Sequence, residues 1–253
     1  MNFIKRLVFK YGIPAIGQLL GYRNKYVNVI YYHDVVDGEG ETFMRMGFDT
    51  FKKQMEYLVS QGYTTCRFDD LKSEKDYCFA PKRVLIAFDD GWRSNYSKIY
   101  ELMKELGLKY NVFLTISEIG KNRDYLDWEM IRKMHQGGLV GFGVHTYSHP
   151  DMSDISRIDP EIEFNKADSI FKEELGFDPL DFCYPYGKYS EGSNDYISKN
   201  LDYRRIYTSK MMYSYCQNGK IIFSRTAISD CDSIGVFRAK LNGYYNVWRS
   251  LFG

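Results

Sequence analysis

Two adjacent aspartates, Asp89 and Asp90, close an apolar run in the segment VLIAFDDGW, residues 84–92. The alternating bulky apolar residues of this run predict a buried strand. Two carboxylates at the tip of such a strand need partners, because an unpaired buried charge is costly. One aspartate could cap the following helix, and Gly91 suits a tight turn, but two aspartates exceed what capping requires. The pair therefore indicates a site with a chemical role.

Two of the chain's four histidines, His145 and His149, fall in one pentapeptide, HTYSH. If this segment forms a helical turn, the two imidazoles lie on one side, with their Cβ atoms about 6 Å apart. With one strand-end carboxylate they would form a ligand set that leaves positions open on a divalent metal. Because an isolated HxxxH is common by chance, the prediction depends on its position after the strand-like residues 139–144.

A third motif, YPYG at residues 184–187, follows the strand-like segment DFC. Strand-like and helix-like segments alternate along the chain, which predicts parallel βαβ units in an α/β domain. The carboxyl ends of parallel strands share one face, so the three motifs should meet there. We expect strands at residues 27–35, 83–90, 110–117, 139–145, 181–185, 203–209 and 221–228, and helices at residues 48–62, 94–106, 127–138, 160–175 and 232–243.

The segments AFDDGW, YLDWEMIRKM, HTYSHP and YPYG resemble, in this order, the motif series of the polysaccharide deacetylases. This carbohydrate esterase group includes the nodulation-type (NodB) chitooligosaccharide deacetylases. The resemblance runs from about Val27 to about Gly243, and YYHDV and FSRTAI resemble the branch that acts on poly-N-acetylglucosamine. It implies a distorted (β/α)7-type barrel, with fewer than eight regular strand–helix units.

The resemblance also implies a role for each motif residue. A divalent metal, usually zinc, would be held by Asp90, His145 and His149, and Asp89 would be the general base. The backbone N–H of Tyr186 would face the oxyanion. These roles agree with the chemistry of amide hydrolysis, because metal binding lowers the pKa of water to about 7 and a second carboxylate can accept its proton.

Two positions depart from the family pattern. Cys183 stands where the family often has an arginine, and Arg225 is our candidate replacement, with a surface ion pair as the alternative. The late histidine that protonates the leaving amine is absent, since no histidine follows His149. His33, at a predicted strand end, is the candidate general acid, and a purely structural hydrogen bond is its alternative role. His135, beside polar residues at a helix end, is expected to be solvated.

These observations predict a metal-dependent hydrolase that removes acetyl groups from N-acetylated amino sugars of a polysaccharide or glycan precursor. The same site could act on O-acetyl esters of carbohydrates. A protein of another class, a catalytically degenerate glycan-binding protein, is the competing hypothesis, supported by the two departures. A metal phosphoesterase is disfavoured because no second set of metal ligands is evident.

The overall composition limits the classes of binding partner and the cellular compartment. The 34 basic and 33 acidic residues give no electrostatic footprint for nucleic acid. Five scattered cysteines do not form a disulfide framework and favour a reducing compartment.

An N-terminal extension, residues 1–26, is expected before a single deacetylase-like domain, residues 27–253. Its apolar run is too short and interrupted to span a bilayer, and it shows no signal cleavage site. We expect a helix packed on the domain, with peripheral membrane contact as the alternative. The expected location is therefore cytoplasmic or at the membrane surface, where the substrate would be a precursor.

Overall fold

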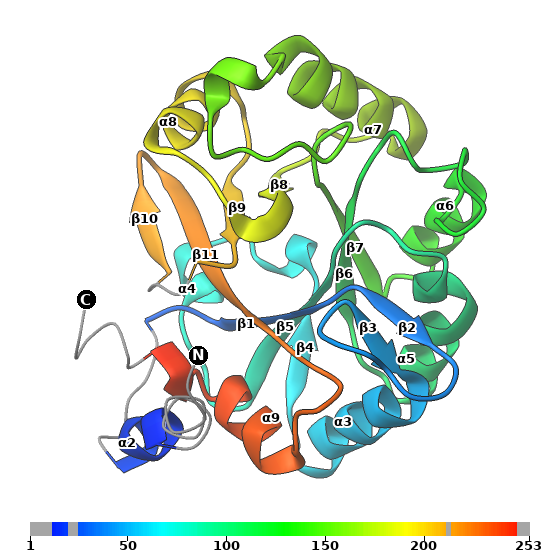
Figure 1. Cartoon of the computed structure of the whole chain (residues 1–253), viewed down its shortest axis with the longest axis vertical. Helices are drawn as coiled ribbons and strands as arrows, with labels where there is room; N and C mark the ends of the chain where they lie inside the picture. The colour runs from blue at the N-terminus through cyan, green and yellow to red at the C-terminus, as the bar shows by residue number, and fades with distance from the viewer. Residues whose placement is uncertain (1–11, 20–24, 211–213, 247–253) are drawn as a thin grey trace.

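The computed structural model describes residues 12–19, 25–210 and 214–246 (Figure 1). Seven parallel strands form a closed barrel, because β1 pairs with β11 on one edge and with β5 on the other. The prediction of a distorted (β/α)7-type barrel is confirmed. The barrel strands, in order around the ring, are β1 (Asn28–Tyr32), β11 (Lys220–Ala227), β9 (Arg205–Thr208), β8 (Asp181–Cys183), β7 (Val140–Val144), β6 (Tyr110–Leu114) and β5 (Arg83–Phe88).

In the described part of the chain, four strands of three residues each lie outside this ring. Strand β4 (Thr64–Cys66) pairs with β5 in parallel, and β10 (Tyr215–Gln217) pairs with β11 in antiparallel fashion. Strands β2 (Asp34–Val36) and β3 (Arg45–Gly47) form a separate two-stranded sheet.

Helices surround the barrel and cover its outer apolar face (Figure 1). The predicted helices at 94–106 and 160–175 each start with a π-helical stretch, η3 (Asn95–Tyr100) and η5 (Glu161–Lys166). Asp127 caps α6 as a side-chain acceptor for the Met130 N–H. The helices and helical turns are α2 (Ile13–Leu19), α3 (Phe48–Ser60), η2 (Phe68–Asp70), α4 (Glu74–Tyr77), η3 (Asn95–Tyr100), α5 (Glu101–Glu105), α6 (Trp128–Gln136), η4 (Ile155–Arg157), η5 (Glu161–Lys166), α7 (Ala167–Leu175), η6 (Pro185–Gly187), α8 (Glu191–Asn200), α9 (Ile234–Leu241) and η7 (Tyr244–Asn246).

The barrel interior is a packed core. Side chains alternate along each strand between the interior and the helix-facing side. Inside, four aromatic rings contact one another in the order Phe68, Phe113, Tyr207 and Phe223. The centroids of successive rings lie 4.9 to 5.1 Å apart. This aromatic layer fills the barrel, so any functional cavity must lie at one of its ends.

The amino ends of β8 and β9 are joined by a buried ion pair. Arg205 donates to both carboxylate oxygens of Asp181, at 2.6 and 2.5 Å. It also donates to the backbone carbonyl of Leu71, and the Tyr207 hydroxyl donates to Asp181. Both charges of this buried pair are therefore matched and further hydrogen-bonded, as burial of an ion pair requires.

Asn111, on β6, satisfies the backbone where β4 separates from β5. Its side-chain amide donates to the carbonyls of Cys66 and Ile86, both at 3.0 Å, and its oxygen accepts from the Phe68 N–H at 2.6 Å. The residue is completely buried. A single side chain thus provides the hydrogen bonds that ladder pairing cannot supply at this splayed point.

Helix α2 belongs to the predicted N-terminal extension and packs near the other end of the chain. A Cβ atom on Gly17 would lie 2.8 Å from the Tyr244 carbonyl oxygen, which indicates close backbone contact. Residues 1–11 and 20–24, which make up much of the segment for which membrane contact is predicted, lie outside the described residues. Among the helices that the structure describes, none has the length and apolar character needed to cross a bilayer.

We predict that Asn111→Leu lowers the free energy of unfolding by about 3 kcal/mol, because it leaves buried backbone groups without partners. Urea unfolding followed by circular dichroism would measure the change. The exposed Asn200→Ala provides the control and should shift stability by less than about 1 kcal/mol. A similarly small loss for Asn111→Leu would show that water or local rearrangement replaces these hydrogen bonds.

Candidate metal centre and active site

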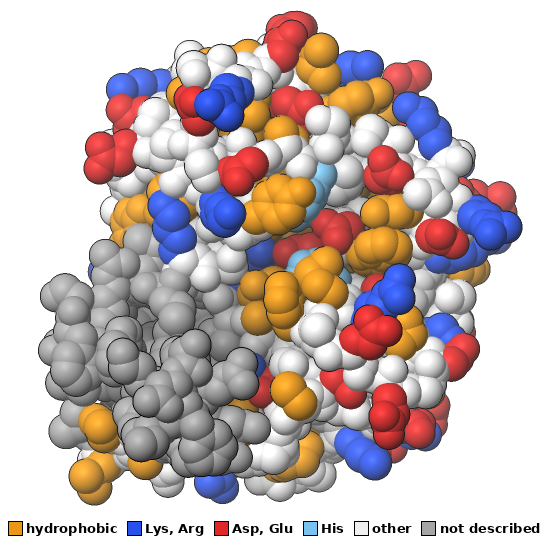
Figure 2. All heavy atoms as spheres, in the orientation of Figure 1, with side chains coloured by type: hydrophobic (Ala, Val, Ile, Leu, Met, Phe, Trp, Pro, Cys, Tyr) orange, Lys and Arg blue, Asp and Glu red, His pale blue; other side chains and the backbone are white. Residues whose placement is uncertain are grey.

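A cavity of about 240 Å³ opens at the carboxyl ends of the barrel strands. In Figure 2, carboxylates and histidine lie at the bottom of a central hollow, with hydrophobic side chains at its edges. The cavity collects all seven side chains that the sequence singled out. It is lined by Tyr31, His33, Phe43, Met44, Asp89, Asp90, His145, His149, Tyr186, Gly187, Ser209 and Arg225.

Strand alternation explains how three of these polar groups reach the same place. In the closed barrel, a residue two positions beyond an inward apolar residue also faces the barrel axis. The interior apolar cluster includes a residue of this kind on three strands. These three residues are Tyr31, Ala87 and Phe223. His33, Asp89 and Arg225 each lie two positions after one of them, in the same order.

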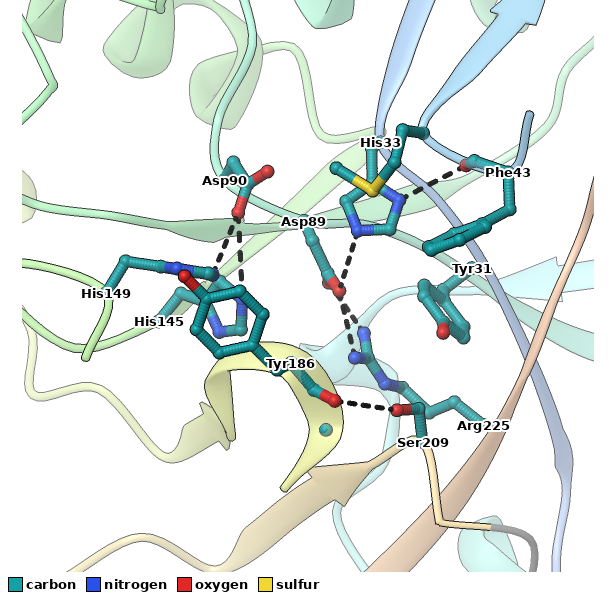
Figure 3. A pocket seen from close by; sticks show the side chains of 12 residues that line it. Tyr31, His33, Phe43, Asp89, Asp90, His145, His149, Tyr186, Ser209 and Arg225 are labelled. Carbon is teal, nitrogen blue, oxygen red and sulfur yellow. Dashed lines mark hydrogen bonds and ion pairs between the residues drawn. The ribbon is translucent and has the colours of Figure 1, made fainter. Parts of the chain in front are cut away.

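Asp90, His145 and His149 present a compact set of possible metal ligands (Figure 3). Asp90 Oδ1 lies 3.4 Å from Nε2 of His149 and 3.7 Å from Nε2 of His145. One atom from each residue lies within 4.8 Å of the others. Such spacing suits one cation about 2 Å from each ligand atom, so this donor set fits a divalent metal.

The environment of His145 favours metal binding. Its Nδ1 lies 2.7 Å from the backbone carbonyl of Cys183, so Nδ1 carries the proton and Nε2 keeps a free lone pair. Burial lowers the pKa of His145 to about 4, despite the opposing effect of Asp89. The ring is therefore neutral at physiological pH, as a metal ligand must be.

The segment that carries the two histidines is not helical, so the prediction of a helical turn was wrong. Thr146 and His149 both have left-handed backbone angles, with φ of 65° and 62°. The Thr146 hydroxyl accepts from the His149 N–H at 3.0 Å. The two imidazoles converge because the chain doubles back after β7, which brings their ring centroids to 4.8 Å.

Asp89 and Arg225 form a buried, bidentate ion pair. Arg225 Nη1 and Nη2 donate to Oδ1 and Oδ2 of Asp89 at 2.6 and 2.9 Å. Both residues are 3 to 4% exposed. Burial raises the pKa of Asp89, but the charge of Arg225 outweighs this effect, and the pKa falls to about 2. Arg225 therefore occupies the place predicted for it, and it keeps this carboxylate ionised.

His33 lies on the opposite side of Asp89 from the metal ligands (Figure 3). Its Nδ1 is 3.3 Å from the Phe43 carbonyl, and its Nε2 is 3.8 Å from Asp89 Oδ2. The carbonyl can only accept, so Nδ1 carries a proton, and Nε2 faces the cavity. His135, by contrast, stacks on Phe177 with centroids 5.1 Å apart and is half-buried, so the prediction that it is solvated was wrong.

Tyr186 forms one wall of the cavity at the turn after β8. Its backbone is left-handed, with φ of 56°, and its side chain is 60% exposed. The ring packs against His149 with centroids 4.6 Å apart. The Ser209 hydroxyl donates to the Tyr186 carbonyl at 3.3 Å, which fixes the orientation of this peptide.

The sequence prediction missed the contacts of Trp92. Its indole N–H donates to Asp90 Oδ2 at 3.0 Å, which leaves Oδ1 toward the histidines. The indole also stacks on Tyr125 with centroids 4.5 Å apart. The feature of the sequence that could have indicated this hydrogen bond is the position of Trp92, two residues after Asp90.

The apolar rim was also missed. Phe43 and Met44 are 46 and 39% exposed at the cavity edge, in the loop between β2 and β3. Asp230 holds this loop, because its two carboxylate oxygens accept from the N–H groups of Gly40 and Gly47 at 3.1 and 2.8 Å. A Cβ atom at Gly40 would lie 2.4 Å from a backbone oxygen, so the approach requires glycine. No local sequence pattern predicts this contact.

Comparison with known proteins identifies the family of this chain. A family model described as polysaccharide deacetylase matches residues 76–206, just over half of the chain. The chain belongs to the polysaccharide deacetylase family. The matched range contains five of the seven predicted site residues, and the other two, His33 and Arg225, lie outside it.

This family member has two informative curated relatives. It is 27% identical over 165 residues to YxkH of Bacillus subtilis, named as a polysaccharide deacetylase, covering 64% of the chain and 57% of the relative. It is 28% identical over 109 residues to the peptidoglycan-N-acetylglucosamine deacetylase of Bacillus cereus, covering 43% of the chain and 38% of the relative. The matches therefore span less than two-thirds of either relative.

Among solved structures, the Streptococcus pyogenes deacetylase PplD in complex with acetate shares the fold. The TM-score is 0.71 at 18% sequence identity, over 85% of this polysaccharide deacetylase family member and 98% of that chain. At this level of identity the likeness concerns the fold of the barrel alone.

We predict that Arg225→Met costs about 3 to 5 kcal/mol of stability at pH 7, because it leaves Asp89 buried without a counter-ion. Burial then raises the pKa of Asp89, so the folded variant binds a proton more tightly than the unfolded chain. The stability of the variant should therefore fall as pH rises from about 5 to 8, whereas the wild-type Asp89, ionised in both states, adds no such slope.

Urea unfolding at several pH values, with a chelator in every sample, would test this prediction. Arg157→Met, at a side chain that is 84% exposed, is the matched control and should leave the pH profile unchanged. Parallel pH profiles for Arg225→Met and the wild type would contradict the assignment of Arg225 as the group that keeps Asp89 ionised.

Proposed function

We propose that the protein is a zinc-dependent hydrolase that removes acetyl groups from N-acetylated amino sugars of a glycan or glycan precursor. The main support is the separation of the two aspartates into different environments. Asp90 faces two histidines, whereas Asp89 is held apart by Arg225 and stays ionised. One carboxylate is thus available as a metal ligand and the other as a base.

Asp90, His145 and His149 would hold the metal. When bound, a divalent cation supplies Lewis acidity, lowering the pKa of water and polarising an acyl oxygen. A carboxylate oxygen of Asp89 lies within 4.8 Å of a ring nitrogen of His145, close enough to accept a proton from water at this site. Arg225 orients Asp89 and stabilises its negative charge until the proton is transferred.

The other side of the reaction requires an acid and an oxyanion donor. In its imidazolium form, His33 would protonate the leaving amine through its Nε2–H, because its Nδ1–H is already committed to the Phe43 carbonyl. The backbone N–H of Tyr186 would donate to the oxyanion, a contribution worth about 3 kcal/mol in other enzymes. His33 approaches from β1 and Tyr186 from the turn after β8, so the acyl group would bind between them.

The cavity rim suits a sugar ring. Exposed aromatic and apolar side chains, Phe43, Met44 and Tyr186, stand beside a polar floor. A pyranose has an apolar C–H face that packs on such side chains, while its polar groups reach charged residues. The relative from Bacillus cereus, named for peptidoglycan N-acetylglucosamine, supports an N-acetylated amino sugar as the substrate.

We predict acetate release from N-acetylglucosamine oligomers by the zinc-loaded protein. Chelation should abolish it and added zinc should restore it, and Asp89→Asn should lower kcat by roughly 10²- to 10⁴-fold through loss of the base. Enzymatic acetate detection would measure both effects. The exposed Asp151→Asn, close to His149 in sequence, is the control and should retain activity.

Two outcomes would overturn the proposal. Glycan binding without acetate release under any divalent metal would support the degenerate binding protein instead. Activity confined to acetylated hydroxyls would support the carbohydrate esterase.

The role of His33 can be tested through the leaving group. We predict that His33→Gln lowers kcat on an N-acetylated oligomer by about 10²-fold, but on an aryl acetate by less than tenfold, because a phenolate leaves without protonation. Parallel kinetics on the two substrates would measure the difference. Equal losses on both would assign His33 a structural role.

A further inference from the structure

We infer that Glu163 is a positioning residue for the metal ligand His149. Glu163 lies on the π-helical stretch η5, outside the residues that line the cavity, and its side-chain hydrogen bonds go to neither aspartate of the site. It acts on the backbone between the two histidines. This inference rests on the proposed metal site and adds to it the device that shapes one of its ligands.

All side-chain hydrogen bonds of Glu163 go to that segment. Oε2 accepts from the backbone N–H groups of Tyr147 and Ser148 at 3.1 and 2.9 Å. Oε1 accepts from the Ser148 hydroxyl at 2.6 Å. The Glu163 backbone carbonyl also accepts from the Tyr147 N–H, at 3.1 Å. The carboxylate therefore holds the two residues directly before His149 through three donors.

The carboxylate is buried and has no charged partner. Glu163 is 7% exposed, and no ion pair joins it to a cation within the described ranges. The nearby ammonium groups of Lys121 and Lys166 lie over the Tyr147 ring instead, at 5.8 and 4.1 Å from its centroid. A buried carboxylate without a counter-ion is costly, so its hydrogen bonds to this loop must stabilise it substantially.

The loop needs such support because its backbone is strained. Thr146 and His149 are both non-glycine residues in the left-handed region. Each such residue costs of order 1 to 3 kcal/mol and persists only where its surroundings fix it. The Thr146 hydroxyl fixes one end of the turn, through the His149 N–H, and Glu163 fixes the two residues between.

The two histidines depend on this support to different degrees. His145 continues directly from β7, is 1% exposed, and has its ring tied to the Cys183 carbonyl. His149 sits beyond the turn, with a side chain 24% exposed. Loss of Glu163 should therefore release His149 while leaving His145 and Asp90 in place, and should weaken metal binding more than folding.

Metal affinity of the full chain, measured by competition with a chromophoric zinc chelator, tests the inference. We expect Glu163→Ala to raise the zinc Kd by about 10- to 100-fold, as for other outer residues that orient ligands. Glu163→Gln, which keeps an acceptor oxygen, should raise it by less than about threefold. The exposed Glu161→Ala, on the same turn, is the matched control and should leave the Kd unchanged.

Melting of the metal-free variants separates positioning from folding. A Glu163→Ala protein that melts close to the wild type but binds zinc weakly supports the inference, and wild-type affinity overturns it. If Glu163→Ala does not fold, Ser148→Ala removes one of the three donors. It should raise the Kd by about two- to fivefold, and an unchanged value overturns the inference. A wild-type protein that binds no zinc would instead refute the proposed function itself.

Discussion

Strand β1 is hydrogen-bonded on both edges, to β5 and to β11, and this double pairing closes the barrel. Closure makes the inward direction of every strand point to one axis. Polar side chains from sequence-distant strands therefore meet above the aromatic core, where His33, Asp89 and Arg225 lie. An open sheet with the same strands would spread these groups along an edge.

Within this frame, neighbouring carboxylates acquire different properties from their contacts. Asp89 continues the inward alternation of β5 and meets the guanidinium of Arg225. Asp90 departs from extended geometry, with φ of 72°, and its side chain turns toward the histidines and Trp92. The change of backbone conformation between two adjacent residues thus separates the proposed base from the proposed metal ligand. The left-handed Asp90 is the structural origin of that separation.

Much of this arrangement could be predicted from the sequence. The strand-end positions of Asp89 and His145 follow from apolar periodicity, and the order of the motifs indicated the family. Arg225 was predicted because one position lacked its arginine and a strand-like segment elsewhere contained one. These inferences succeeded because they depend on local pattern or on strand alternation, which the barrel preserves.

The features that escaped prediction are those fixed by contacts between distant segments. In the turn before His149, Glu163 from another element accepts from the two residues that separate the left-handed Thr146 and His149. The loop with Phe43 and Met44 reaches the cavity because Asp230 binds its backbone from nearly two hundred residues away. Neither contact has a local sequence pattern, so periodicity alone could not reveal the loop shapes.

The guanidinium beside Asp89 comes from β11, while the corresponding inward position on β8 is the small, buried Cys183. In a ring of strands, one point near the axis lies within reach of several strands, and a long side chain from any of them can supply the same charge. Chemistry is therefore tied to a position in space rather than to a position in a motif. Homologues that lack the motif arginine can keep the same electrostatics through a basic residue on another strand of the barrel. Such sites should be compared by the positions of their charged groups near the barrel axis.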